Sequence, residues 1–199
     1  DLPTCVNLIC WTIMGLALAG IGMSVMHDAN HGAYSANKKV NTLLGYTLNL
    51  AGASVFNWKL QHNILHHTYT NVVHYDEDID DKGFMRFSPH TRRKKYQSLQ
   101  VVYAFLFYAV ITLYWVIAKD LLQFIRYTKN GVNPNKPKEN VITFLKISAV
   151  KISYLFVTLF VPIYFAELPW LQVISGFLIM LGVAGLILTV IFQLAHSGA

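Results

Sequence analysis

Long apolar runs separated by polar stretches organise this chain of 199 residues. The first run, residues 5–26, carries no charged residue, and a helix that rises about 1.5 Å per residue over that length crosses a hydrocarbon layer of roughly 30 Å. Three further runs cover residues 99–118, 147–166 and 170–195. A weaker apolar stretch at residues 40–56 is interrupted by asparagines and glycines, which favours an interfacial or partly embedded helix.

The composition agrees with a location in the bilayer. Hydrophobic residues make up 54% of the chain and charged residues 13%, against about 25% charged residues in ordinary soluble domains. The net charge of +6 comes from lysines and arginines in the polar stretches, which indicates cytoplasmic loops and no nucleic-acid partner. Cys5 and Cys10 lack C-x-x-C spacing, so they predict neither a disulfide framework nor a thiolate metal site. We expect an all-α integral membrane protein with a single domain over residues 1–199.

Six of the eight histidines lie at the ends of apolar runs. His27 and His31 follow the first run four residues apart, a spacing that places both imidazoles on one helix face, within reach of a common metal ion. Taken alone, this pair is more typical of a polar helix end at the membrane interface than of a metal site. His196 follows the last run, where a lone histidine is more often an interfacial anchor than a ligand. Only a shared membrane face with the other histidines makes His196 a candidate ligand.

The remaining candidate ligands are His62, His66 and His67. On an α-helix His62 and His66 point to one side, and His67 is turned by about 100 degrees, toward a second ion. The alternative is a solvated basic loop, but imidazole nitrogens near apolar surroundings need partners. Imidazole suits zinc, copper, iron and nickel, so ligand type alone leaves the metal open. Six histidines exceed the ligands of one zinc, which favours two metal ions, and redox chemistry would favour iron.

The other two histidines, His74 and His90, lie in polar sequence. We interpret them as surface residues or as residues that support the ligands. His74 precedes the acidic residues 76–81, which we expect to form a solvated loop. Within that loop Asp76 or Asp78 could accept hydrogen bonds that orient ligand imidazoles.

The membrane topology follows from charge and from the need to bring the histidines to one face. Residues 119–146 are basic, whereas residues 167–169 between the last two runs carry no basic residue, so the positive-inside rule places the former in the cytoplasm and the latter outside. Three crossings between His67 and His196 would put His196 on the opposite face. We therefore predict that residues 99–118 enter and return, or lie shallowly. The last two runs then form a hairpin below a cytosolic histidine-rich cap.

The order of these motifs resembles that of the membrane fatty acid desaturase family. The resemblance rests on H-x-x-x-H at His27 and His31, H-x-x-x-H-H at His62, His66 and His67, and a lone histidine after a transmembrane hairpin. The surrounding sequences MHDANHG (26–32) and HHTYTN (66–71) look like the bacterial acyl-lipid and linoleoyl-CoA branch of that family. The resemblance covers essentially the whole chain.

The resemblance implies an enzyme that uses O2 and two electrons to insert a double bond into an acyl chain at a di-iron centre. The iron ligands, and so the catalytic residues, would be His27, His31, His62, His66, His67 and His196. It also implies an acyl-CoA or acyl-lipid substrate, surrounding membrane lipid, and cytochrome b5 or a ferredoxin as electron donor. The expected location is a bacterial cytoplasmic membrane, crossed several times, with the active site on the cytoplasmic face.

Two features of the family are absent from the chain: a third histidine box, Q- or H-x-x-H-H, and an additional transmembrane segment near the beginning. We therefore expect a chain truncated at both ends, with an incomplete site and no activity by itself. A related membrane di-iron hydroxylase or ketolase is the alternative among enzymes. A histidine-rich metal transporter is the alternative of another class, disfavoured because the histidines lie at the ends of the runs.

Overall fold

The structure is a computed structural model that describes residues 3–70, 72, 75–77, 85–86 and 93–196, with the side chains of 193–196 excepted. Every regular element among these residues is helical, and no strand occurs in them. In chain order the elements are α1 (Thr4–Gly20), η1 (Ile21–Val25), α2 (Met26–Asn30), α3 (Lys38–Gly45), α4 (Thr47–Leu50), α5 (Val55–Trp58), η2 (Lys59–His66), η3 (Lys95–Leu99), α6 (Gln100–Tyr114), η4 (Trp115–Lys119), α7 (Asp120–Lys129), α8 (Pro137–Leu155), η5 (Phe156–Phe160), α9 (Val161–Tyr164) and α10 (Trp170–His196). The elements η1, η2, η4 and η5 are π-helical, and η3 is a 3₁₀-helix.

Four continuous helical stretches in the described residues are long and apolar enough to cross a membrane. They are Thr4–Asn30, Lys95–Lys129, Pro137–Tyr164 and Trp170–Phe192. The prediction of an all-α membrane protein is therefore confirmed, with one helical stretch for each of the four apolar runs. The weaker stretch at residues 40–56 forms only the short helices α3 and α4 and the start of α5.

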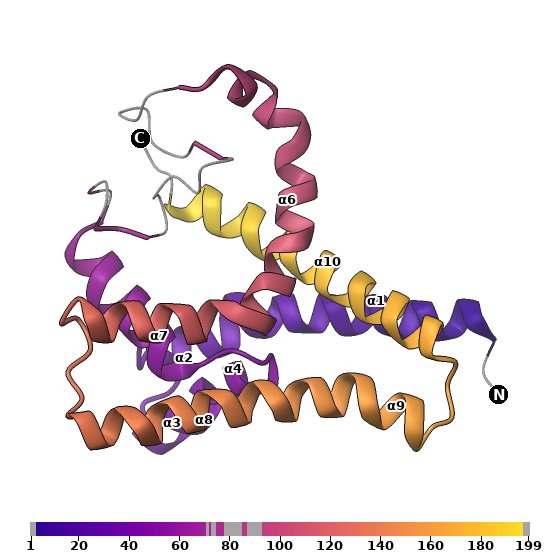
Figure 1. Ribbon diagram of the computed structural model, residues 1–199, viewed down its shortest axis with the longest axis horizontal. Coiled ribbons are helices and arrows are strands. Elements are labelled where there is room, and N and C mark those ends of the chain that lie inside the picture. The colour runs from indigo at the N-terminus through magenta and orange to yellow at the C-terminus, as the bar shows by residue number, and fades with distance from the viewer. Residues whose placement is uncertain (1–2, 71, 73–74, 78–84, 87–92, 197–199) are drawn as a thin grey trace.

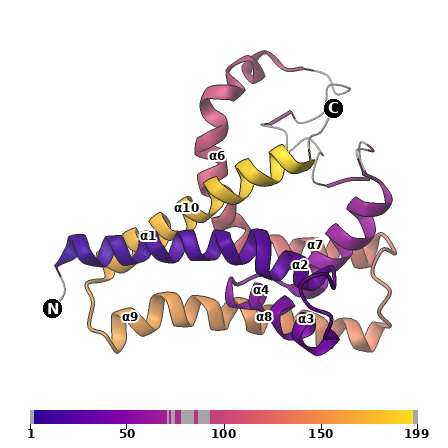
Figure 2. The same cartoon turned by 180° about the vertical axis from the view of Figure 1, so that it is seen from behind.

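The long helices run roughly parallel or antiparallel to one another, with one exception. In Figures 1 and 2, α1 and α10 lie side by side and both end at the side of the molecule where α2 and α3 lie, while α8 and α9 run the opposite way. The exception is α6, which stands across the others until the chain bends at η4 and continues as α7. The re-entrant or shallow course of residues 99–118 stays a prediction.

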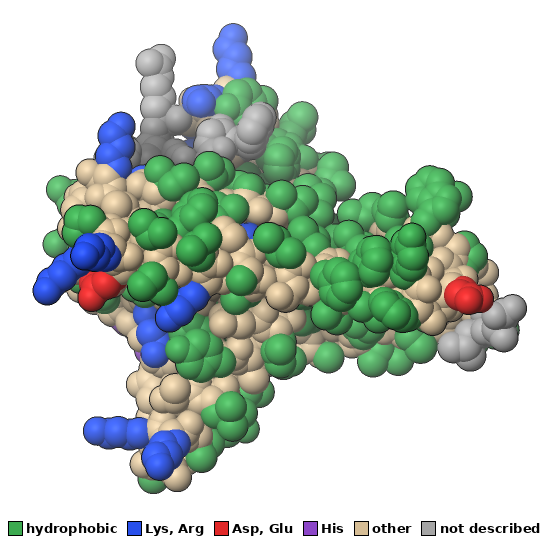
Figure 3. All heavy atoms as spheres, turned by 60° about the horizontal axis from the view of Figure 1, so that its bottom comes forward, with side chains coloured by type: hydrophobic (Ala, Val, Ile, Leu, Met, Phe, Trp, Pro, Cys, Tyr) green, Lys and Arg blue, Asp and Glu red, His purple; other side chains and the backbone are tan. Residues whose placement is uncertain are grey.

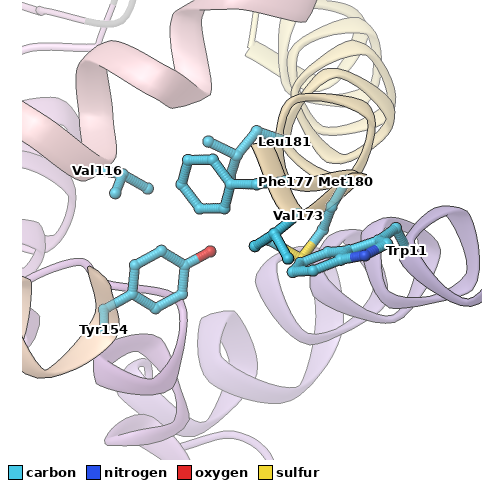
Figure 4. Close-up of a cluster of buried hydrophobic side chains, with 7 residues drawn as sticks. All are labelled: Trp11, Val116, Tyr154, Val173, Phe177, Met180 and Leu181. Carbon is cyan, nitrogen blue, oxygen red and sulfur yellow. The ribbon is translucent and has the colours of Figure 1, made fainter. Parts of the chain in front are cut away.

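An apolar core holds the long helices together between α1, α8 and α10. It consists of Trp11, Val116, Tyr154, Val173, Phe177, Met180 and Leu181 (Figure 4). Glycines bring the backbones close: an added Cβ on Gly15 would lie 2.6 Å from the Met180 carbonyl oxygen, and one on Gly185 would lie 2.5 Å from the Tyr108 carbonyl oxygen. Small residues at helix contacts are typical of membrane bundles, where close van der Waals packing drives association.

The surface distinguishes the two ends of the molecule. Apolar side chains cover much of the face in Figure 3, and lysines and arginines gather toward the left, the end at which α1 finishes in Figure 1. Exposed leucines and isoleucines occur on all four long stretches. An apolar surface of this extent is typical of contact with lipid rather than water. Together with the four apolar helices, it identifies a membrane protein.

Candidate metal centre

The first histidine pair lies where the first membrane helix ends. The helix continues from α1 through the π-helical turn η1 into α2, which carries His27, and His31 is the residue that ends α2. Gly32 follows with φ of 76°, and the amides of Gly32 and Ala33 donate to the carbonyls of Ala29 and Asp28. These bonds form a Schellman motif, which ends a helix through a residue in the left-handed region. The glycine thus ends the helix immediately after the second ligand candidate.

The second group lies on the π-helix η2, which covers His62 and His66 and ends at His67. The sequence predicted an α-helix in which His67 turns away from His62, and this detail is wrong. A π-helix has a wider turn, closed by i→i+5 hydrogen bonds. The residues four and five positions after His62 therefore lie on the two sides of His62, one turn further along the helix. The rings of His66 and His67 both contact that of His62, and the rings of His62 and His67 contact the first pair.

The five rings of His27, His31, His62, His66 and His67 form one group, called here the histidine cluster. Neighbouring ring centroids lie between 4.5 Å, for His27 and His31, and 5.3 Å, for His66 and His67. The Nε2 atoms of His27 and His62 are 3.3 Å apart. Potential ligand atoms of His27, His31 and His62 all lie within 4.8 Å of one another. The structure therefore brings together five of the six predicted ligands, and their role as ligands stays a prediction.

The pKa of His31 suits metal binding. Desolvation by burial, followed by the neighbouring imidazoles of His27, His62 and His67, lowers the pKa of His31 to about 4. The side chain of His31 is exposed on one side, so we give the crowding of rings the greater weight, because two protonated rings at this separation repel each other. At neutral pH His31 is thus a neutral ring with a free lone pair, the form that a metal ion binds.

Carboxylates lie within hydrogen-bonding distance of the Nδ1 atoms of two of the rings. The Nδ1 atom of His66 lies 3.0 Å from both carboxylate oxygens of Asp76, which is fully buried. This contact confirms one of the two hydrogen-bond partners expected from the acidic loop. The Nδ1 atom of His27 lies 3.0 Å from Oδ1 of Asp28. A carboxylate that accepts from Nδ1 leaves Nε2 unprotonated and fixes the plane of the ring, as in many metal sites.

Two aromatic side chains enclose the cluster. Trp58 packs against His62 with ring centroids 4.6 Å apart, and against His31 at 5.6 Å. Phe192, near the end of α10, lies 6.2 Å from His27. Nothing in the spacing of Trp58 distinguishes it in the sequence from the other aromatic residues of the chain. Its position directly before η2 was the one available signal.

Several predicted residues cannot be placed in the site. The backbone of His196 ends α10, and its side chain is outside the described part of the chain. His74, His90 and Asp78 also lie outside the described residues. Cys5 and Cys10 are both exposed and unpaired, which agrees with the absence of a disulfide framework.

Comparison with known proteins relates this site to a family. The fatty acid desaturase family matches residues 3–199. The sn-1 linoleoyl-lipid 6-desaturase of Arthrospira platensis is 33% identical over 92% of this chain and 49% of its own length, and the protein of the same name from a Synechocystis strain is 33% identical over 96% and 52%. An acyl-lipid (8-3)-desaturase of Physcomitrium patens is 30% identical over 92% of this chain and 38% of its own length.

No solved structure matches the chain. The chain spans about half the length of the first two of these relatives. The match nevertheless extends over nearly every residue present here, including both histidine groups. The chain belongs to the fatty acid desaturase family.

Proposed function

We propose that this chain is the membrane core of an O2-dependent desaturase that inserts a double bond into a lipid acyl chain. The observation that carries the proposal is the convergence of five imidazoles, from two separate histidine motifs, at the end of the first candidate membrane span. Ordinary acid and base groups do not suffice for this reaction, because a saturated methylene has no acidic proton. A redox-active metal within reach of an acyl chain is required.

The donor set fits iron. Neutral imidazole nitrogen binds iron, and the close approach of His27 and His62 is near the roughly 3 to 3.5 Å between two ligands of one ion with metal–nitrogen bonds of about 2.0–2.1 Å. We propose His27, His31, His62, His66, His67 and His196 as ligands of two iron ions. Bound iron would supply the dioxygen chemistry by which two hydrogens leave adjacent methylenes, while O2 with two electrons and two protons becomes two waters.

The residues of this chain prepare the site for that chemistry. Asp76 orients His66 so that its Nε2 atom points away from the carboxylate. Trp58 and Phe192 place apolar rings against the imidazoles, which restricts water near the ligands. We propose that an acyl chain dissolved in the bilayer approaches these rings at the end of the bundle where α1 leads into α2.

The relatives and the charge distribution suggest the substrate and the orientation. The Arthrospira and Synechocystis relatives are named for a linoleoyl-lipid, so we propose an acyl-lipid substrate in preference to acyl-CoA. Lysines and arginines gather toward the histidine-bearing end, which favours a cytoplasmic position for that end in a bacterial membrane. Cytochrome b5 or a ferredoxin, each an electron-transfer protein, is the proposed donor.

The test is expression of the full-length protein in a host of known lipid composition, followed by mass spectrometry of its fatty acids. We expect a new double bond in lipid-bound acyl chains, and its loss when His62 is replaced by alanine. A hydroxylated or keto product would favour the related hydroxylase or ketolase. Metal uptake into reconstituted vesicles without any change in lipids would contradict the proposal and favour a transporter.

A further inference from the structure

A buried ion pair joins α7 and α8. The Nζ atom of Lys151 in α8 lies 3.0 Å from Oδ2 of Asp120, the first residue of α7, and the two side chains are 5% and 7% exposed. Lys151 lies within the candidate span Pro137–Tyr164. Removing two charges from water carries a cost of several kcal/mol per ion, so such a pair calls for an explanation beyond helix packing.

Lys151 fills the gap left by the bend of the chain between α6 and α7. Its Nζ atom lies 2.8 Å from the carbonyl oxygen of Trp115 and 2.9 Å from that of Val116, the first two residues of η4. A third carbonyl, that of Gly52, lies 3.3 Å away. Where a helix bends, carbonyl groups lose their regular partners. The ammonium group lies within reach of these three carbonyls and of Asp120, so its three protons have more acceptors than they need.

Asp120 connects the same bend to the helix that bears the second histidine group. Its Oδ2 atom accepts a hydrogen bond of 3.0 Å from the backbone amide of Ser54, and its carbonyl oxygen accepts one of 2.6 Å from Nδ2 of the fully buried Asn57. Ser54 is the N-cap of α5, with its side chain accepting from the Asn57 amide. Because α5 leads directly into η2, these two bonds fix the start of the helix that carries His62 and His66.

We propose that Asp120 and Lys151 are positioning residues for the histidine cluster, which hold the start of η2 against the bend between α6 and α7. The inference rests on the proposed metal-dependent function of that cluster. Neither residue touches a histidine. The pair acts through Ser54 and Asn57, and a shift of that anchor would move His62, His66 and His67 together relative to His27 and His31.

The test compares Lys151→Met with Lys146→Met, a substitution of an exposed lysine on the same helix, in full-length protein in lipid nanodiscs. Hydrogen exchange of the metal-free protein, followed by mass spectrometry, reports on residues 54–67. Titration with Co²⁺, followed by its ligand-field absorption, reports on the geometry of the imidazoles. Circular dichroism and size exclusion establish that each variant retains its helices, and Lys151→Arg tests for rescue.

We expect Lys151→Met to keep its helical content, to exchange faster at residues 54–67, and to bind Co²⁺ about 10- to 100-fold more weakly with an altered spectrum. Lys151→Arg should recover most of the affinity, and Lys146→Met should match the wild type. Equal exchange and equal Co²⁺ spectra in Lys151→Met and wild type would overturn the positioning role.

If Lys151→Met does not fold, Asp120→Ala serves in its place, because alanine removes the side-chain acceptor of the Ser54 amide and keeps the backbone carbonyl that Asn57 contacts. Unchanged exchange and an unchanged Co²⁺ spectrum in that variant would likewise overturn the inference. Failure of the wild-type protein to bind Co²⁺ would count against the metal centre itself. The exchange measurement needs no metal, so the two failures are distinguishable.

Discussion

The apolar core and the histidine cluster are both closely packed, but they differ in what their packing achieves. In the core, Val173 and Met180 are almost completely buried and glycines allow backbones to touch, so the contacts themselves stabilise the fold. In the cluster, five rings of the same chemical kind stand about as close as packing allows, and the crowding depresses the pKa of His31. We infer that substitutions in the core act mainly on folding and substitutions in the cluster mainly on metal binding.

The substitution expected to destabilise the core most adds a side chain where the backbones of α1 and α10 touch. Gly15→Leu adds a side chain whose Cβ would lie 2.6 Å from the Met180 carbonyl oxygen, so α1 must separate from α10. We expect a loss at or above the upper end of the roughly 1–3 kcal/mol that overpacking usually costs. Thermal unfolding in detergent, monitored by circular dichroism, measures it.

Gly20→Leu is the matched control, because it lies on the same helix and an added Cβ meets no atom within 4 Å. We expect unfolding of this variant close to that of the wild type. Equal destabilisation by both substitutions would show that helix propensity or lipid contact, rather than the contact with α10, determines the effect.

The cluster is broken most directly at His62, which contacts all four of the other rings. We expect His62→Ala to reduce Fe²⁺ affinity by about 100-fold or more. Substitution of a residue that only hydrogen-bonds to a metal ligand already lowers metal affinity by about 10- to 100-fold. The unfolding temperature of the metal-free protein should change little compared with Gly15→Leu. A His62→Ala variant that binds iron normally, or that fails to fold without metal, would contradict the assignment of folding to the core and metal binding to the cluster.

A smaller effect on Fe²⁺ affinity is expected for a residue that orients a ligand without binding the metal. Asp76→Asn replaces the carboxylate that orients His66 with an amide, which can still accept one hydrogen bond but removes the charge. We expect Fe²⁺ affinity to fall by about 10-fold, the lower end of such effects. Glu77→Gln is the control, because it makes the same carboxylate-to-amide change next to Asp76 on a side chain that contacts Arg126 and Gln123. Equal losses in the two variants, measured by calorimetry, would contradict the role of Asp76.

The smallest effect concerns the surface pair of Arg126 and Glu77, whose closest atoms are 2.7 Å apart. The Arg126 side chain is 54% exposed, so water and salt screen the pair. Arg126→Ala should cost less than about 1 kcal/mol of stability and leave Fe²⁺ affinity unchanged. A loss of iron affinity comparable with that of Asp76→Asn would mean that the outer surface also positions the cluster.

Much of the membrane architecture could be predicted from the sequence, because four apolar runs need only length and hydrophobicity to specify helices. The pairing within each histidine group was equally accessible, since four-residue spacing places His27 beside His31 and His62 beside His66. Asp76 was one of two expected partners. These features depend on local pattern, which a single sequence records.

Features that depend on the tertiary arrangement could not be predicted. The π-helical turn that brings His67 beside His62 has no distinctive residue pattern, and an α-helix was the reasonable expectation. Lys151 was visible only as an isolated charge in an apolar run, because its partner Asp120 lies on another helix. The role of Trp58 at the cluster likewise depends on how α5 meets the end of the first membrane helix.

The central claim is that the histidine cluster binds iron through its imidazoles. X-ray absorption at the iron edge of the purified full-length protein tests it most directly, since imidazole ligands produce characteristic scattering from their outer ring atoms. We predict several imidazoles bound to iron in the wild type and fewer in His62→Ala. Iron bound without imidazole scattering, or a wild-type spectrum unchanged by His62→Ala, would contradict the account.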